Sequence, residues 1–126
     1  MQMKTLAALS ADLAAGHNTS ENLVRDCLDR ISDPDGEGGR AFIKVYAEPA
    51  LAAARAADAS RSAGLVASPL AGIPISIKDL FDIGGEVTRA GSIVLNDASP
   101  AICDAPAISR LRAAGVILVG RTNMTE

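Results

Sequence analysis

The chain has 126 residues, 48% of them hydrophobic, which fits one globular domain and excludes an intrinsically disordered protein. Only 2% are aromatic and the net charge is −3 without a basic stripe, which argues against binding to nucleic acid or to an anionic membrane surface. No stretch reaches the roughly 18 to 20 apolar residues that a membrane-spanning helix needs.

Two cysteines, Cys27 and Cys103, stand far apart and without CxxC spacing. Such a pair is typical of reduced thiols, which predicts a cytoplasmic protein. The N-terminus resembles a signal peptide, but Asp12 interrupts its apolar run, so an amphipathic helix is expected there. The cysteines and a single histidine, His17, cannot form a zinc site, and no phosphate-binding or dinucleotide fingerprint is present. We therefore expect neither metal nor cofactor.

Two helices are predicted at the start of the chain. Leu residues recur at helical spacing from Leu6 to Leu13, and Gly16 ends this segment. Thr19 or Ser20 can cap a second helix, whose apolar stripe contains Leu23, Val24, Cys27, Leu28 and Ile31. The run of Asp, Pro and Gly at 33–39 then predicts a loop.

The rest of the chain alternates strands and helices, which predicts an α/β fold with parallel pairing through a crossover. In chain order we expect a strand at 41–46, an Ala-rich helix at 51–62 with Pro49 in its first turn and Gly64 after its end, a strand at 73–77, a short strand or turn at 87–95, a helix capped by Asp104 and closed by Gly115, and a strand at 116–119.

The strand at 116–119 is aliphatic at every position, which indicates burial on both faces. A strand of this kind needs neighbours on both edges, and only seven residues follow it. The pattern therefore indicates a sheet that sequence outside this chain, or a second chain, completes.

Lys78 is the candidate catalytic residue. On a strand, Ile73, Ile75 and Ile77 would share one face and Ser76 and Lys78 the other. The carboxyl end of a strand is where open α/β sheets place functional groups. Burial there disfavours the ammonium form, and lowering the lysine pKa from about 10.4 to near 7 corresponds to about 4–5 kcal/mol.

From spacing alone, a plainer interpretation fits better: Lys78 exits the strand into solvent, or pairs with Asp79 or Asp82. The other candidates are weak. His17 lies in a polar turn and Ser92 has no base near it in the sequence, so a Ser-His-Asp arrangement is not supported. The two aspartates are better explained as carboxylates that position a loop.

Four segments resemble the amidase-signature family, in order and at natural spacing. Leu70–Asp79 is similar to the family's lysine strand, and Thr88–Ser92 to the small-residue segment that follows it. Asp104–Gly115 and Val119–Glu126 resemble the helix and strand that lead toward the active site. The resemblance implies that residues 1–126 are the N-terminal portion of one amidase-signature domain, with a helical lead at 1–32, a loop at 33–39 and an α/β part at 40–126.

The resemblance also implies hydrolysis of a carboxamide C–N bond by a Ser-cisSer-Lys triad. Lys78 would be the base that activates the nucleophilic serine through the cis-serine, and an acyl-enzyme would then be hydrolysed by water. The family's Gly-Gly-Ser-Ser-Gly-Gly and later Gly-Ser segments are absent from this chain. Only Lys78 is transferred, and the isolated chain is predicted to be inactive.

Two alternatives stay open. One is the A subunit of a glutamyl-tRNA(Gln) amidotransferase, and the other is a non-catalytic remnant or one half of a split protein. The partners expected are a small-molecule amide and either a second copy of the chain or, for an amidotransferase, further subunits. Direct contact with nucleic acid or a membrane is not expected.

Overall fold

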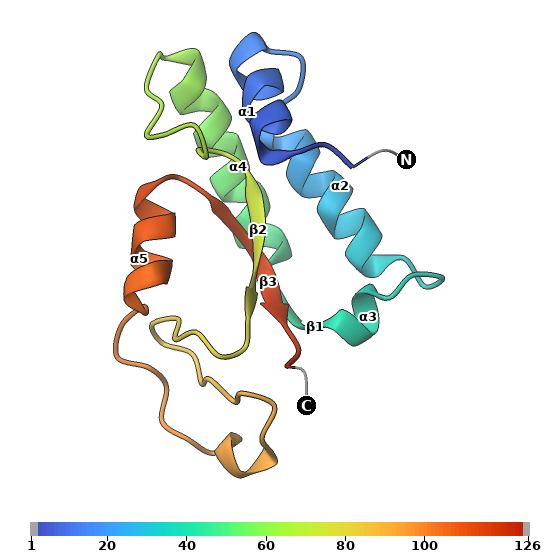
Figure 1. Cartoon of the computed structure of the whole chain (residues 1–126), viewed down its shortest axis with the longest axis vertical. Helices are drawn as coiled ribbons and strands as arrows, with labels where there is room; N and C mark the ends of the chain where they lie inside the picture. Colours follow the sequence, from blue (N-terminus) through green and yellow to red (C-terminus); the bar gives the residue numbers. More distant parts are fainter. Residues whose placement is uncertain (1–2, 125–126) are drawn as a thin grey trace.

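The computed structural model describes residues 3–124, which form a small sheet with helices on both faces (Figure 1). Residues 1–2 of the predicted helical lead and residues 125–126 of the Val119–Glu126 segment lie outside the described residues. In chain order the elements are α1 (Leu6–Ala15), α2 (Ser20–Ser32), α3 (Gly38–Ala41), β1 (Phe42–Val45), α4 (Ala47–Ser62), β2 (Pro74–Lys78), the 3₁₀ helix η1 (Ile93–Leu95), α5 (Pro106–Ala113) and β3 (Ile117–Thr122).

The predicted end of the first helix at Gly16 and the predicted N-cap of the second at Thr19 are both confirmed. The Thr5 hydroxyl accepts a hydrogen bond from the Ala8 N–H at the start of α1, and Gly16 ends this helix with a left-handed φ of 71°. Thr19 caps α2 in the same way. The Asp58 carboxylate of α4 also accepts hydrogen bonds from the first two N–H groups of α2, at 2.8 and 3.0 Å. The N-terminus of α2 is thus held against α4.

The sheet is mixed, with strand order β1-β3-β2. β2 and β3 run parallel with α5 in the connection between them, and β1 pairs antiparallel with β3. This confirms the predicted α/β class. The central strand β3 has neighbours on both edges within the chain, because β1 returns from far earlier in the sequence to pair with the edge that β2 leaves open.

The central strand β3 is buried on both faces, as its aliphatic run predicts. On one face, Ile117 and Val119 pack with Val24 of α2 and with Ala50 and Ala54 of α4. On the other face, Leu118 packs with buried residues that include Ile77 of β2 and Ile108 of α5. Figure 1 shows the same division, with α2 and α4 on one side of the sheet and α5 on the other.

Three local expectations differ from the structure. The loop predicted at 33–39 is shorter, because α3 begins at Gly38, where a Cβ would clash with the Ile31 carbonyl of α2. Asp104 does not cap α5, which begins at Pro106 after Ala105. The third concerns Ile73, which does not share a face with Ile75 and Ile77.

Ile73 lies just before β2, after Gly72, whose φ of 83° turns the chain. Its side chain packs with Leu13 and Leu23 of the leading helices, whereas Ile77 joins the cluster around α5. The period of two therefore holds only inside the strand. Within residues 3–124, no helix has both the length and the apolar character needed to cross a membrane.

Candidate functional site around Lys78

Lys78 is the last residue of β2 and pairs in register with Thr122 of β3. Its side chain is partly buried. Within the part of the chain that the structure describes, the Lys78 amine forms no hydrogen bond or ion pair. Asp79 and Asp82, the pairing partners considered from sequence, are engaged elsewhere: with Arg121 and Thr88, respectively.

Asp79, the residue after Lys78, is held in place by hydrogen bonds of both its backbone N–H and its backbone carbonyl. The Asp79 N–H donates to the Thr122 carbonyl at 3.0 Å, so the β2–β3 ladder continues one residue past the strand. The Asp79 carbonyl accepts from the Ala90 N–H at 2.9 Å. This second bond brings the Thr88–Ser92 segment back against the end of β2. Lys78 therefore leaves the sheet beside two segments that resemble the amidase-signature motifs.

Ala90 and Gly91 turn the Thr88–Ser92 segment sharply. Both residues have positive φ, 50° for Ala90 and 73° for Gly91. A Cβ on Gly91 would lie 3.0 Å from the Met124 side chain, so a larger residue has little room there. A positive φ on alanine is uncommon and costs about 1–3 kcal/mol, which the surrounding contacts must offset.

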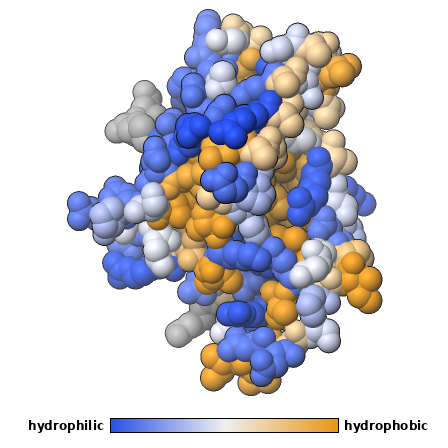
Figure 2. Space-filling model, turned by 180° about the vertical axis from the view of Figure 1, so that it is seen from behind, coloured by the Kyte–Doolittle hydropathy of each residue, from blue (hydrophilic) through white to orange (hydrophobic). Residues whose placement is uncertain are grey.

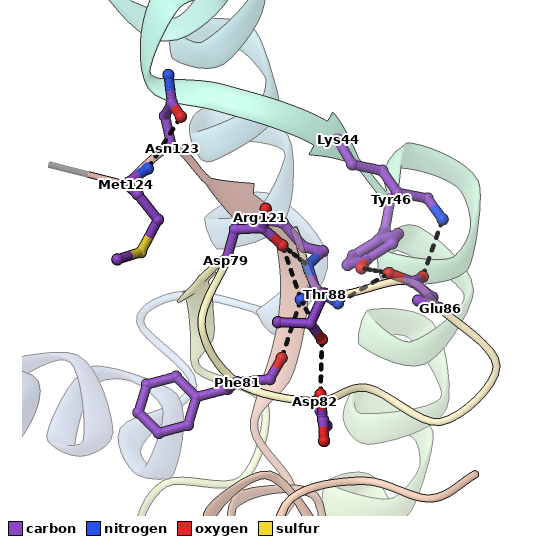
Figure 3. Close-up of polar contacts among 10 residues, drawn as sticks. All are labelled: Lys44, Tyr46, Asp79, Phe81, Asp82, Glu86, Thr88, Arg121, Asn123 and Met124. Atoms are coloured by element: carbon purple, nitrogen blue, oxygen red, sulfur yellow. Dashed lines mark hydrogen bonds and ion pairs between the residues drawn. The ribbon is translucent and has the colours of Figure 1, made fainter. Parts of the chain in front are cut away.

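Arg121 of β3 is the centre of a buried polar network (Figure 3), which includes Asp79, the residue after Lys78. Its side chain is only 2% exposed. The guanidinium lies 2.9–3.0 Å from the Asp79 carboxylate, donates to the Phe81 carbonyl at 2.9 Å, and reaches Glu86 at 3.2 Å and Thr88 at 3.3 Å. All four partners belong to the loop that follows Lys78. One side chain of the central strand therefore organises this loop.

Glu86 joins the network to β1. Its carboxylate accepts hydrogen bonds from the Tyr46 hydroxyl at 2.7 Å and from the Lys44 amine at 2.9 Å (Figure 3). Burial alone would raise the pKa of Glu86, but these hydrogen bonds and Arg121 outweigh it, so the pKa lies below its usual value. Burial, together with the hydrogen bond to Glu86, raises the pKa of Tyr46. Tyr46 therefore remains a neutral donor and Glu86 an ionised acceptor.

The remaining candidates from the sequence lie apart from this network. Ser76 is exposed on β2. The Ser92 N–H donates to the Arg89 carbonyl within its turn. His17 is 75% exposed at the C-terminal end of α1, near Asp12. Cys27 and Cys103 are both free thiols, as their spacing predicts. Among residues 3–124, no group of three or more His, Cys, Asp or Glu side chains is placed to hold a metal ion.

The two aspartates position the loop, as expected. Asp79 is buried in its ion pair with Arg121, and Asp82 accepts from Thr88 at 2.7 Å. Arg121 itself was missed as a functional candidate. The signal that could have found it is an arginine in direct continuation of a buried aliphatic strand, because a charge there requires a buried partner.

Comparison with known proteins matches residues 22–126 to the family model Amidase. The A subunit of glutamyl-tRNA(Gln) amidotransferase from Chromohalobacter salexigens is 44% identical over all of this chain, which covers 25% of that protein. The protein of the same name from Ralstonia pickettii is 47% identical, with 24% of its length covered. The chain thus spans about a quarter of the length of these curated relatives.

Solved structures agree with the sequence match. The native peptide amidase of Stenotrophomonas maltophilia superposes with a TM-score of 0.82 at 36% identity, over 95% of this chain and 24% of that one. The order and pairing of elements around Lys78 are therefore those of a fold already seen in amidases. The chain belongs to the amidase family of amidase-signature enzymes, and it matches their N-terminal portion.

Proposed function

We propose that Lys78 is the general base of a carboxamide-hydrolysing enzyme that uses a Ser-cisSer-Lys triad. In this proposal residues 1–126 contribute the lysine of one amidase-signature domain, and the two serines come from sequence outside the matched quarter. The observation that carries the proposal is the Lys78 amine: it stands at the carboxyl end of a core strand, partly buried and without a partner in residues 3–124.

The surroundings suit a base. A lysine that is paired with a carboxylate is held in its ammonium form, which cannot accept a proton. Here both neighbouring aspartates are occupied, Asp79 by Arg121 and Asp82 by Thr88. No carboxylate in residues 3–124 therefore engages the Lys78 amine, and in this proposal the amine exchanges a proton with a serine hydroxyl and passes it to the leaving group, which is the work of a general acid–base catalyst.

A chimera tests this proposal. Residues 1–126 replace the matching quarter of the Stenotrophomonas peptide amidase, and ammonia release from a peptide amide is measured. Lys78→Ala is expected to lower kcat by about 10²–10⁴-fold, the usual contribution of a positioned acid–base group. The isolated 126-residue chain is expected to release no ammonia.

Lys4→Ala is the matched control, because Lys4 lies just before α1 and its side chain is 57% exposed. This control should leave kcat within about twofold, as is usual for a surface change. Circular dichroism confirms that each chimera is folded. Activity of the Lys78→Ala chimera above about a tenth of the parent would remove Lys78 from the mechanism, given the size of that contribution.

A second candidate function is supported by the curated relatives. Both relatives named above are A subunits of glutamyl-tRNA(Gln) amidotransferases, at 44% and 47% identity. In this case the ammonia would be passed on within an assembly of further subunits. Affinity purification of the protein from its own cells decides: two co-purifying subunits favour the amidotransferase, whereas a homodimer or a lone chain favours a general amidase acting on small amides.

We also propose a cytoplasmic location, supported by the two free thiols. The remnant or split-protein alternative is tested by sequencing the gene beyond the codon for Glu126. An open frame that encodes a Gly- and Ser-rich segment supports the enzyme, and a stop codon supports the alternative.

A further inference from the structure

The position of the Lys78 amine depends on the backbone that carries it. Within residues 3–124 no group binds this amine directly, so its place is set by where the chain leaves β2. That direction is decided at Asp79, the next residue. Its N–H and carbonyl are both hydrogen-bonded, and its carboxylate is only 3% exposed and faces Arg121.

Arg121 joins Asp79 to the first part of the following loop, as far as Thr88. The guanidinium contacts Asp79 at the start of the loop, the Phe81 carbonyl in its first turn, and Glu86 and Thr88 on its return (Figure 3). Arg121 is itself rigidly placed, because it belongs to the central strand and pairs with both β1 and β2. The loop thus takes its shape from a buried side chain in the middle of the sheet.

We propose that Arg121 is a positioning residue for Lys78: it fixes Asp79 and the 79–90 loop, and thereby the direction in which the lysine amine points. This inference rests on the proposed function only for its catalytic consequence. Fixed geometry matters for a base, since a displacement of about 1 Å can lower a rate by roughly 10²-fold.

The residue type at 121 follows from the contacts. A guanidinium carries five N–H donors in a planar fork, and here its nitrogens reach four different groups. A lysine keeps the charge but donates from a single point and cannot reach all four at once. Arg121→Lys therefore separates the geometry of the contacts from their charge.

The test uses the 126-residue chain with its lysines labelled with ¹³C at Cε. The sequence has three lysines, Lys4, Lys44 and Lys78, and each Arg→Lys variant adds a fourth, so the Lys78 signal is assigned by its loss in Lys78→Ala. In Arg121→Lys we expect the Lys78 signal to move and the Lys4 signal to stay. Amide exchange at Asp79 and Ala90 should accelerate about tenfold or more, with Ile117 in the sheet core unchanged, because local opening is independent of global unfolding.

Arg40→Lys is the matched control. Arg40 also pairs with a carboxylate, that of Glu37 at 2.9 Å, but its side chain is 83% exposed and both residues lie outside the 79–90 loop. This control should move neither the Lys78 signal nor the two amides. If Arg121→Lys does not fold, Thr88→Val carries the test, since it keeps the shape of the side chain while removing the hydroxyl that contacts Arg121.

Unchanged Lys78 and Ala90 signals in the folded variant would overturn the positioning role. That outcome is distinct from failure of the proposed function, which is judged by Lys78→Ala in the chimera. If the Lys78→Ala chimera stays active while the Lys78 signal shifts in Arg121→Lys, Arg121 still positions the lysine. Only the catalytic role of Lys78 is then refuted.

Discussion

Arg121 and Asp79 form an ion pair that is almost completely removed from water, at 2% and 3% exposure. Such a pair adds little to the free energy of unfolding when compared with apolar replacements of both residues. Removing one partner alone is costly, because it leaves an uncompensated buried charge. Without Arg121, the second carboxylate, Glu86, keeps Tyr46 and Lys44 as donors. Asp79, by contrast, pairs with no other cation within residues 3–124. The asymmetry makes Asp79 the group that depends on Arg121.

Arg121→Met is therefore expected to lower the free energy of unfolding by about 3–5 kcal/mol, measured by urea denaturation. Arg112→Met, which breaks the exposed Arg112–Asp104 pair, should cost less than about 1 kcal/mol. Equal losses in the two variants would contradict the buried network.

Acidification should weaken the same network through Glu86. The pKa of Glu86 is below its usual value of 4.5, so the folded chain binds fewer protons than the unfolded chain in this range. The stability from Glu86 is fully present above pH about 4.5 and is lost as the pH falls through the lower folded pKa. We expect Tm to fall on acidification below that value, and to fall less in Glu86→Gln. If Tm falls equally with pH in the parent and in Glu86→Gln, Glu86 is not the source of the acid sensitivity.

At the residue scale, the sequence marks Lys78 as a candidate more clearly than it marks Arg121. Lys78 stands out because it ends an apolar strand, which is a local pattern. Arg121 acquires its role from partners 33 to 42 residues earlier in the chain. No local spacing encodes such contacts, so only the pairing of β2 with β3 brings Asp79 and Thr88 to it.

Among the secondary-structure elements, the β1–β3 ladder depends on a glycine. Gly120 of β3 pairs with Val45, and a Cβ at this position would collide with the Lys44 carbonyl and lie 2.8 Å from the Phe42 ring. Because a backbone carbonyl cannot move aside as a flexible side chain can, β1 must shift to admit even a methyl group.

Gly120→Ala is expected to lower the free energy of unfolding by about 1–3 kcal/mol, the usual cost of overpacking. Gly39→Ala in α3 is the control, since a Cβ there meets no atom within 4 Å. The control should be neutral or slightly stabilising, because alanine favours helix. Thermal unfolding of the two variants provides the comparison. A Gly120→Ala chain as stable as the parent would show that β1 can shift without loss of stability.

The long helices were predictable from periodicity and caps, which are properties of neighbouring residues. Thr19 and Gly16 mark ends that the structure confirms. The failures lie where tertiary contacts decide: Asp104 accepts from the Gly84 N–H and from Arg112 instead of capping α5. The Asp104 carboxylate, which the sequence places well for a helix cap, instead binds the loop that contains Gly84.

Across the whole molecule, burial is concentrated in β3 and falls off toward the loop after β2. Residues 117–121 are buried, whereas Ile93, Val94 and Ile102 of the loop between β2 and α5 are 84%, 85% and 101% exposed. Figure 2 shows apolar side chains gathered at the end of the molecule that this loop forms. Hydropathy could not predict their exposure, because a short aliphatic run in a sequence usually indicates burial.

Hydrogen exchange followed by mass spectrometry should reproduce this gradient. Peptides covering β3 are expected to exchange at least about 100-fold more slowly than peptides covering 92–103, because the central strand opens only when the sheet does. Similar rates in both regions would mean that the sheet is not the stable centre of this chain.

The central strand is also the last of the described strands to be synthesised. Phe42 pairs with Thr122, and Pro74 with Ile117, so β1 and β2 have no strand partner until the chain has been extended through β3. On the ribosome, the apolar faces of α2 and α4 must wait uncovered for most of the translation of this region, which exposes the nascent chain to aggregation.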